Sequence, residues 1–110
     1  MIIDRQENIT VITQESVSLG KFIERFKESY SKYKKDHLIL NLLSLSNLSA
    51  SDLMEFLELS RDHRSAKKSF VIVTNTVSFN DVNEELVVTP TLEEAYDVIE
   101  MEDIERDLDF

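Results

Sequence analysis

Two short runs of alternating hydrophobic and polar residues open the chain, and a run with helical spacing follows them. The alternating runs read MIIDR and ITVITQE, and the turn-like residues QEN lie between them, which predicts a β-hairpin. A first helix is expected over about 18–35, with Ser16 or Ser18 as its cap and lysines at its end. Its apolar positions are Leu19, Phe22, Ile23, Phe26, Tyr30 and Tyr33.

The rest of the chain alternates between strand and helix patterns. The runs HLILNL and SFVIVT are almost wholly apolar, as is typical of strands covered on both faces, and a helical stretch from Ala50 to Arg64 separates them. A short strand, LVVTP, ends at the only proline, and the last helix begins with Thr91 and Glu94 at capping-box spacing. We therefore expect an α/β fold: a mixed, mostly parallel sheet of about five strands, with helices packed on it and right-handed crossovers.

Size and composition favour one domain. The 110 residues are 42 % apolar, which is enough for one compact core, so we expect a single domain over 1–110 with an acidic C-terminal segment over 102–110. The chain has no cysteine, no apolar run of bilayer length and no signal-peptide pattern at its start. These features predict a cytoplasmic protein that does not enter a membrane.

Charge and residue types limit the chemistry that the chain can perform. The net charge of -10 repels nucleic-acid phosphates, and the single glycine leaves no glycine-rich phosphate cradle. His37 and His63 are separated by a strand and most of a helix, which predicts neither a metal site nor a catalytic residue. We expect His63 to be a surface group near a helix end. No cofactor is expected, and the expected partner is another protein.

A longer pattern in the chain is similar to a known family. The segment HLILNLLSLSNLSASDLMEFLELSRDHRSAKKSFVIVTN, followed by TPTLEEAYDVI, resembles the STAS domain of bacterial anti-sigma-factor antagonists. In that family a buried strand leads into a loop and helix with the pattern Asp-Ser-Ser/Thr-Gly-Leu. Alignment on Leu53 places the family's aspartate on Ser49 and its phosphorylated serine on Ala50. The family's next hydroxyl falls on Ser51 and its glycine on Asp52.

This resemblance covers nearly the whole chain and implies a STAS-like fold and a non-catalytic regulatory module. The alanine at the phosphoacceptor position is a departure from the family's serine-kinase switch. A second departure is the segment between Asn75 and Leu86, which is shorter than the helix that the family usually has there.

The chain is also similar to a set of short bacterial proteins that carry the label ribonuclease Z. The nuclease of that name is a much larger metallo-β-lactamase-fold enzyme, whose metals are held by a His-x-His-x-Asp-His cluster and further ligands. Only His37 and His63 are present here, and they form no such cluster. The alternative function that this similarity implies is an enzyme or an accessory enzyme subunit connected with tRNA 3′ processing, without a metal site of its own.

Two interpretations of the stretch from Asn47 to Leu59 stay open. Ser49 precedes a helix and Asp52 follows three residues later, which suits a helix cap. In the other interpretation Ser49 or Ser51 is phosphorylated, and the added charge beside Asp52 alters a docking surface. The loop and helix start around 45–54 follow a strand at its carboxyl end, where open α/β sheets usually bind their partners.

The acidic C-terminal segment has apolar residues with an irregular spacing. Ile104 and Leu108 continue the period of the last helix only after a slip at Glu100–Asp103, which predicts a break or bend there. The detached segment would bury its apolar residues Met101, Ile104, Leu108 and Phe110 by docking on a basic rim of the same chain, or of a second copy in a homodimer. That rim consists of Lys32, Lys34, Lys35, Arg61, Arg64, Lys67 and Lys68.

Overall fold

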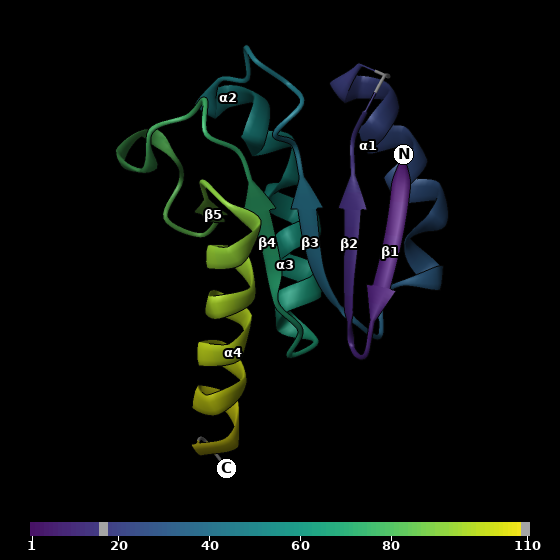
Figure 1. Cartoon of the computed structure of the whole chain (residues 1–110), viewed down its shortest axis with the longest axis vertical. Coiled ribbons are helices and arrows are strands. Elements are labelled where there is room, and N and C mark those ends of the chain that lie inside the picture. The colour runs from purple at the N-terminus through teal and green to yellow at the C-terminus, as the bar shows by residue number, and fades with distance from the viewer. Residues whose placement is uncertain (16–17, 109–110) are drawn as a thin grey trace.

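A five-stranded mixed sheet forms the centre of the protein, in the strand order β1-β2-β3-β4-β5 (Figure 1). The computed structural model describes residues 1–15 and 18–108, so Ser16 lies outside the described residues. The strands are β1 (Ile2–Gln6), β2 (Ile9–Thr13), β3 (His37–Asn41), β4 (Phe70–Val73) and β5 (Val87–Thr89). β1 is antiparallel to β2, and each further neighbouring pair is parallel. The predicted α/β fold with a mostly parallel sheet is confirmed.

One face of the sheet is covered by helices from the first two crossovers. These are α1 (Leu19–Ser29), which continues into the 3₁₀ turn η1 (Tyr30–Lys32), and the segments α2 (Ala50–Leu53), η2 (Met54–Phe56) and α3 (Leu57–Ser65). Their buried aromatic and aliphatic side chains pack on the sheet. This core includes Ile12, Phe22, Phe26, Leu38, Leu40, Phe56, Phe70 and Ile72.

Two predicted helices differ from the observed ones. The first helix was expected to reach 35, but its α-helical part ends at Ser29, whose hydroxyl donates to the carbonyl oxygen of Arg25 at 2.8 Å. The helix expected from Ala50 to Arg64 contains the 3₁₀ turn η2. A 3₁₀ turn aligns residues three apart, and it directs both Leu53 and Phe56 into the core, where both are fully buried.

The segment between β4 and β5 covers the same face as α1 and α3. It contains only a short 3₁₀ turn, η3 (Phe79–Asp81), among the described residues. Val77 and Val82 from this segment pack against the core cluster, together with Val88 of β5. An irregular loop therefore takes the place that a third crossover helix would have on this face.

The opposite face carries α4 (Leu92–Leu108), which runs antiparallel to the parallel strands and in front of the β4 and β5 side (Figure 1). Ala95 and Ile99 of α4 are buried against Ile39, Val71 and Val73 of the sheet. We call the edge at which β2 to β5 end the carboxyl edge, and the edge at which they begin the amino edge. The loops before α2 and before α4 lie at the carboxyl edge, and α4 extends past the amino edge (Figure 1).

The break predicted at Glu100–Asp103 is wrong, because α4 is one continuous helix from Leu92 to Leu108. Its inward face changes from the apolar residue Ile99 to the polar residues Glu102 and Arg106. These three positions are three and four residues apart and therefore share a helix face. The helix needs no bend, since polar contacts replace apolar burial along the same face.

Candidate functional site

The loop between β3 and α2 ends in a helix cap built from Ser49 and Asp52. The Ser49 hydroxyl accepts a hydrogen bond from the Asp52 amide at 3.3 Å, and the Asp52 carboxylate accepts one from the Ser49 amide at 3.0 Å. This reciprocal pair is a capping box, and it satisfies backbone donors that a helix start leaves unpaired. Both side chains of the pair therefore have a structural task at this position.

Ser51 lies beside this cap and is exposed. Its hydroxyl oxygen is 2.9 Å from the hydroxyl oxygen of Ser49. The structure thus brings Ser49, Ser51 and Asp52 together in a single turn at the carboxyl edge. Ala50, which aligns with the phosphoacceptor of the STAS pattern, is half-buried in the same turn.

Hydrogen bonds hold the β3–α2 loop against the two neighbouring loops. The Ser44 hydroxyl donates to the carbonyl oxygen of Gln14 at 2.7 Å, and it also contacts the Gln14 side-chain oxygen. On the other side, the Thr76 hydroxyl donates to the carbonyl oxygen of Leu48 at 3.3 Å. The side chain of Leu48 is itself buried in the core. These contacts fix the loop in one position on the sheet.

Two large apolar side chains of this segment nevertheless face solvent. Leu43 is 37 % exposed and Met54 is 43 % exposed, although their neighbours Leu42 and Leu53 are fully buried. They stand at the two ends of the segment that contains the capping box. A fixed loop with exposed apolar side chains and an exposed hydroxyl can bind a complementary protein surface. We call residues 43–54 the loop–helix surface.

The second predicted cap lies at the start of α4, on the other face of the sheet. The Glu94 amide donates to the Thr91 hydroxyl at 3.1 Å, and the Thr89 hydroxyl donates to the carbonyl oxygen of Thr91 at 2.9 Å. The Glu94 side chain lines an open cavity of about 380 Å³ beside the ends of β4 and β5, together with Asn75 and Pro90. Thr91 and Glu94 therefore cap a different helix, α4, from the one that Ser49 and Asp52 cap.

The amino edge holds a polar cluster that sequence reasoning did not predict. His63 of α3, expected at the surface, is fully buried. Its Nε2 atom lies 2.8 Å from the carbonyl oxygen of Asp36, which can only accept, so Nε2 carries the proton. Its Nδ1 atom then accepts from the Tyr30 hydroxyl at 2.6 Å. Burial lowers the pKa of His63 below its ordinary value.

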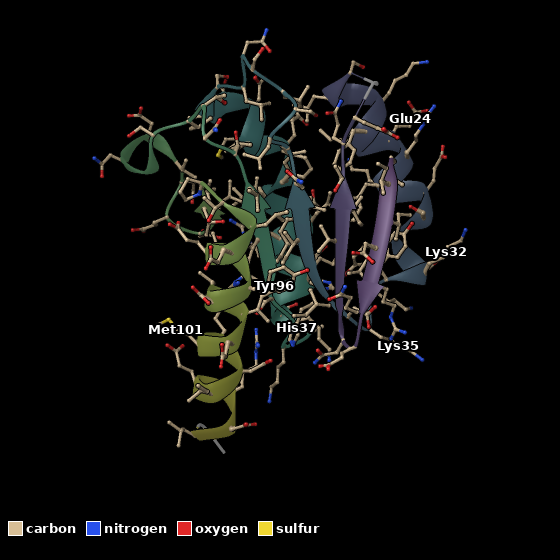
Figure 2. The ribbon with its side chains drawn as sticks, viewed as in Figure 1. Glu24, Lys32, Lys35, His37, Tyr96 and Met101 are labelled. Carbon is tan, nitrogen blue, oxygen red and sulfur yellow. The ribbon has the colours of Figure 1, made fainter. Side chains whose placement is uncertain are left out.

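His37, at the start of β3, has the same tautomer. Its Nδ1 atom accepts from the Ser69 amide at 2.9 Å, so its Nε2 atom carries the proton and faces the Asp103 carboxylate at 3.0 Å. Burial lowers the pKa of His37, although Asp103 opposes that shift. In Figure 2 His37 lies at the lower end of β3, on the side where α4 passes. Both histidines are thus neutral and hydrogen-bonded, and both are buried at the amino edge.

Glu102 of α4 is the centre of the adjoining ion pairs. Its carboxylate accepts two hydrogen bonds from Arg64, at 2.7 and 3.2 Å, and one from the Ser69 hydroxyl at 2.6 Å. Burial alone would raise the pKa of Glu102, but the hydrogen bonds from Arg64 and Ser69, together with the charges of Arg64 and Arg106, hold the pKa below its ordinary value. Arg106 also donates to the Ser69 hydroxyl at 2.9 Å. This network attaches the last turns of α4 to the domain.

The prediction that a detached acidic segment docks on the basic rim agrees with the structure only in part. One member of the basic rim, Arg64, does pair with Glu102 of the acidic segment. Met101, Ile104 and Leu108, which were expected to be buried, face solvent instead, and Phe110 lies outside the described residues. The polar side chains of the segment therefore make its contacts with the domain, and the apolar ones do not.

The comparisons with known proteins assign no family to the chain. No protein-family model matches it, and no curated protein matches it. In residues 1–15 and 18–108, no group of three or more His, Asp or Glu side chains could hold a metal ion. Over the same residues, the structure contains no helix whose length and apolar character would let it cross a membrane.

Proposed function

We propose that this protein is a non-catalytic, STAS-like regulatory module of the cytoplasm, which binds another protein through the loop–helix surface. The order of elements supports this proposal, because the sequence pattern that resembles the STAS domain falls on β3, α2, α3, β4, β5 and α4 in the expected succession. The aligned positions Ser49, Ser51 and Asp52 meet in one turn at the carboxyl edge.

The exposure of Leu43 in the fixed loop and of Met54 at the start of η2 is the observation that carries the proposal. Covering exposed apolar side chains with a partner makes the free energy of binding more favourable, and a loop that is already fixed loses little conformational entropy on binding. Ser44, Leu48 and Thr76 supply that fixation through contacts with neighbouring loops and the core. The partner would cover the exposed side chains of Leu43, Ser51 and Met54.

Ser51 is the residue through which the proposed module would be regulated. Ser49 is engaged in the capping box, and the aligned phosphoacceptor is Ala50, whereas Ser51 is exposed in the same turn. A phosphate on Ser51 would add about two negative charges beside Asp52 at the start of α2. Negative charge is favourable at a helix start, so the modification would leave the fold intact and change the docking surface.

Photo-crosslinking in cells tests the proposed surface. A photoreactive amino acid is placed at Met54, and in a control protein at Lys35, an exposed residue near the amino edge (Figure 2). We expect one dominant protein adduct from position 54 that position 35 does not give, and we expect Leu43→Asp to abolish it. The proposal is overturned if the adducts from both positions are the same, or if Leu43→Asp has no effect.

A further inference from the structure

The last two turns of α4 have their polar and apolar faces inverted. Glu102, Asp103 and Arg106 point toward the domain and make the ion pairs and hydrogen bonds described above. Met101, Ile104 and Leu108 point away from it and are 60 %, 55 % and 79 % exposed. Figure 2 shows Met101 on the side of α4 that faces away from the sheet. A surface helix ordinarily buries its apolar stripe and exposes its charges, so this arrangement is the reverse of the usual one.

The three apolar side chains form one continuous seam. They are spaced three and four residues apart, so they lie on the same face of the straight helix. We call Met101, Ile104 and Leu108 the outer stripe. Such spacing is what a second helix needs in order to pack its own apolar side chains along an exposed helix.

The charges around the outer stripe restrict what can cover it. Glu100, Glu105 and Asp107 are exposed beside it, and the preceding turns of α4 expose Glu93, Glu94 and Asp97. Arg106, the only basic residue of α4, points inward to Ser69 and Asp103. The fully exposed charged side chains of α4 are therefore all acidic, and a partner that brings lysine or arginine complements them.

A second copy of the chain fits this surface poorly. Two α4 helices packed on each other would bring acidic side chains together without a cation. Three apolar side chains from each copy would also bury far less area than the roughly 800 Å² per partner of a stable interface. The basic rim of a second copy supplies charge, but the described residues expose no large apolar side chain there. The acidic side chains beside the outer stripe also repel anionic lipid headgroups.

We infer that the outer stripe is a docking surface for a basic amphipathic helix of another protein. The large apolar side chains of that helix cover Met101, Ile104 and Leu108, while its lysines or arginines face Glu100 and Glu105. This surface lies at the amino edge, away from the loop–helix surface at the carboxyl edge, so the inference does not depend on the proposed function.

Two synthetic peptides of identical leucine and lysine composition test the inference with the full chain. In one peptide the leucines line a single helix face, and in the other the order is scrambled so that they do not. We expect the amphipathic peptide to bind about tenfold more tightly than the scrambled one. The double variant Ile104→Ser/Leu108→Ser, which keeps every charge, should bind both peptides equally weakly. The matched control Leu43→Ser/Met54→Ser should bind as the unaltered chain does.

Each contrary outcome overturns the inference. If the double variant keeps the preference for the amphipathic peptide, the outer stripe is not the binding site. If only the Leu43→Ser/Met54→Ser control loses that preference, the binding site is the loop–helix surface. Sedimentation of the chain alone should be the same with and without the double substitution, since self-association that the substitution abolishes would mean that a second copy covers the stripe. Binding to phosphatidylcholine vesicles that the substitution abolishes would assign the stripe to a membrane.

Discussion

The Tyr30 hydroxyl donates a hydrogen bond of 2.6 Å to Nδ1 of His63, and the two rings meet edge to face with their centroids 5.6 Å apart. Tyr30 follows the end of α1, and His63 lies in the last turn of α3. This contact joins the ends of the two helices that cover one face of the sheet. The opposite nitrogen of His63 reaches the backbone of Asp36, so the ring also fixes the entry to β3.

Tyr30→Phe should lower the free energy of unfolding by about 1–2 kcal/mol, because it leaves a buried ring nitrogen without its donor. The matched control is Tyr96→Phe, which removes a hydroxyl from a half-buried tyrosine on the opposite face of the sheet. We expect the control to change stability by less than about 0.5 kcal/mol. Urea unfolding at neutral pH measures both. Equal losses in the two variants would mean that the Tyr30–His63 bond contributes nothing.

Stability should fall as the pH is lowered through the histidine range. Burial lowers the pKa of both His37 and His63, so between the unfolded value of about 6.5 and the folded values the unfolded chain binds more protons. The stabilising contribution of the neutral rings is complete above about pH 6.5 and decreases as the pH falls below it. Urea midpoints should therefore drop from pH 7.5 to pH 5.5. Folded-state titration of the ring protons by NMR should give a pKa below 6.5 for each ring, and an unshifted pair would contradict the prediction.

Ser49→Ala should cost about 1 kcal/mol of stability, because it removes the side-chain acceptor of the capping box. Ser49→Asp should be nearly neutral, since aspartate is an equally good N-cap residue. Ser46→Ala, in the exposed part of the same loop, is the control and should have little effect. If all of these proteins unfold at the same urea concentration, Ser49 does not stabilise the helix start.

Glu102→Gln should loosen the last two turns of α4 and lower stability by about 1–3 kcal/mol, because it leaves Arg64 partly buried without its charged partner. Glu105→Gln, an exposed neighbour, is the matched control and should be neutral within about 0.5 kcal/mol. Amide hydrogen exchange should accelerate in residues 100–108 of the first variant only. Unchanged exchange there would show that apolar contacts further up the helix suffice to hold it.

The buried strands could be predicted from the sequence because each is a short run of apolar residues that neighbours in the chain make visible. The apolar run His37–Asn41 has to be covered on both faces, and it is the central strand of the sheet. The turns inside the predicted helices could not be located in this way. The 3₁₀ turn at Met54–Phe56 preserves the inward direction of Leu53 and Phe56, so the hydrophobic pattern of a helix is almost unchanged by it.

The amino-edge cluster could not be predicted, because its partners are far apart in the chain. Tyr30 and His63 are 33 positions apart, and nothing in either local pattern indicates that they meet. One signal was available: His63 is at helical spacing from Phe56 and Ser60, both of which face the core. The outer stripe was misinterpreted for a similar reason. A slip in the apolar spacing at Glu100–Asp103 indicated a bend, whereas the inward face of α4 had changed from apolar to charged residues.

The affinity of the chain for the partner that cross-links at Met54 tests the central claim most directly. Calorimetry would give the dissociation constant for the unaltered chain, for Met54→Asp, and for Lys35→Ser as the control at the opposite edge. We predict that Met54→Asp raises the dissociation constant by about tenfold or more and that Lys35→Ser leaves it within about twofold. Equal affinities for all three proteins, or a loss confined to Lys35→Ser, would contradict the claim that the loop–helix surface binds the partner.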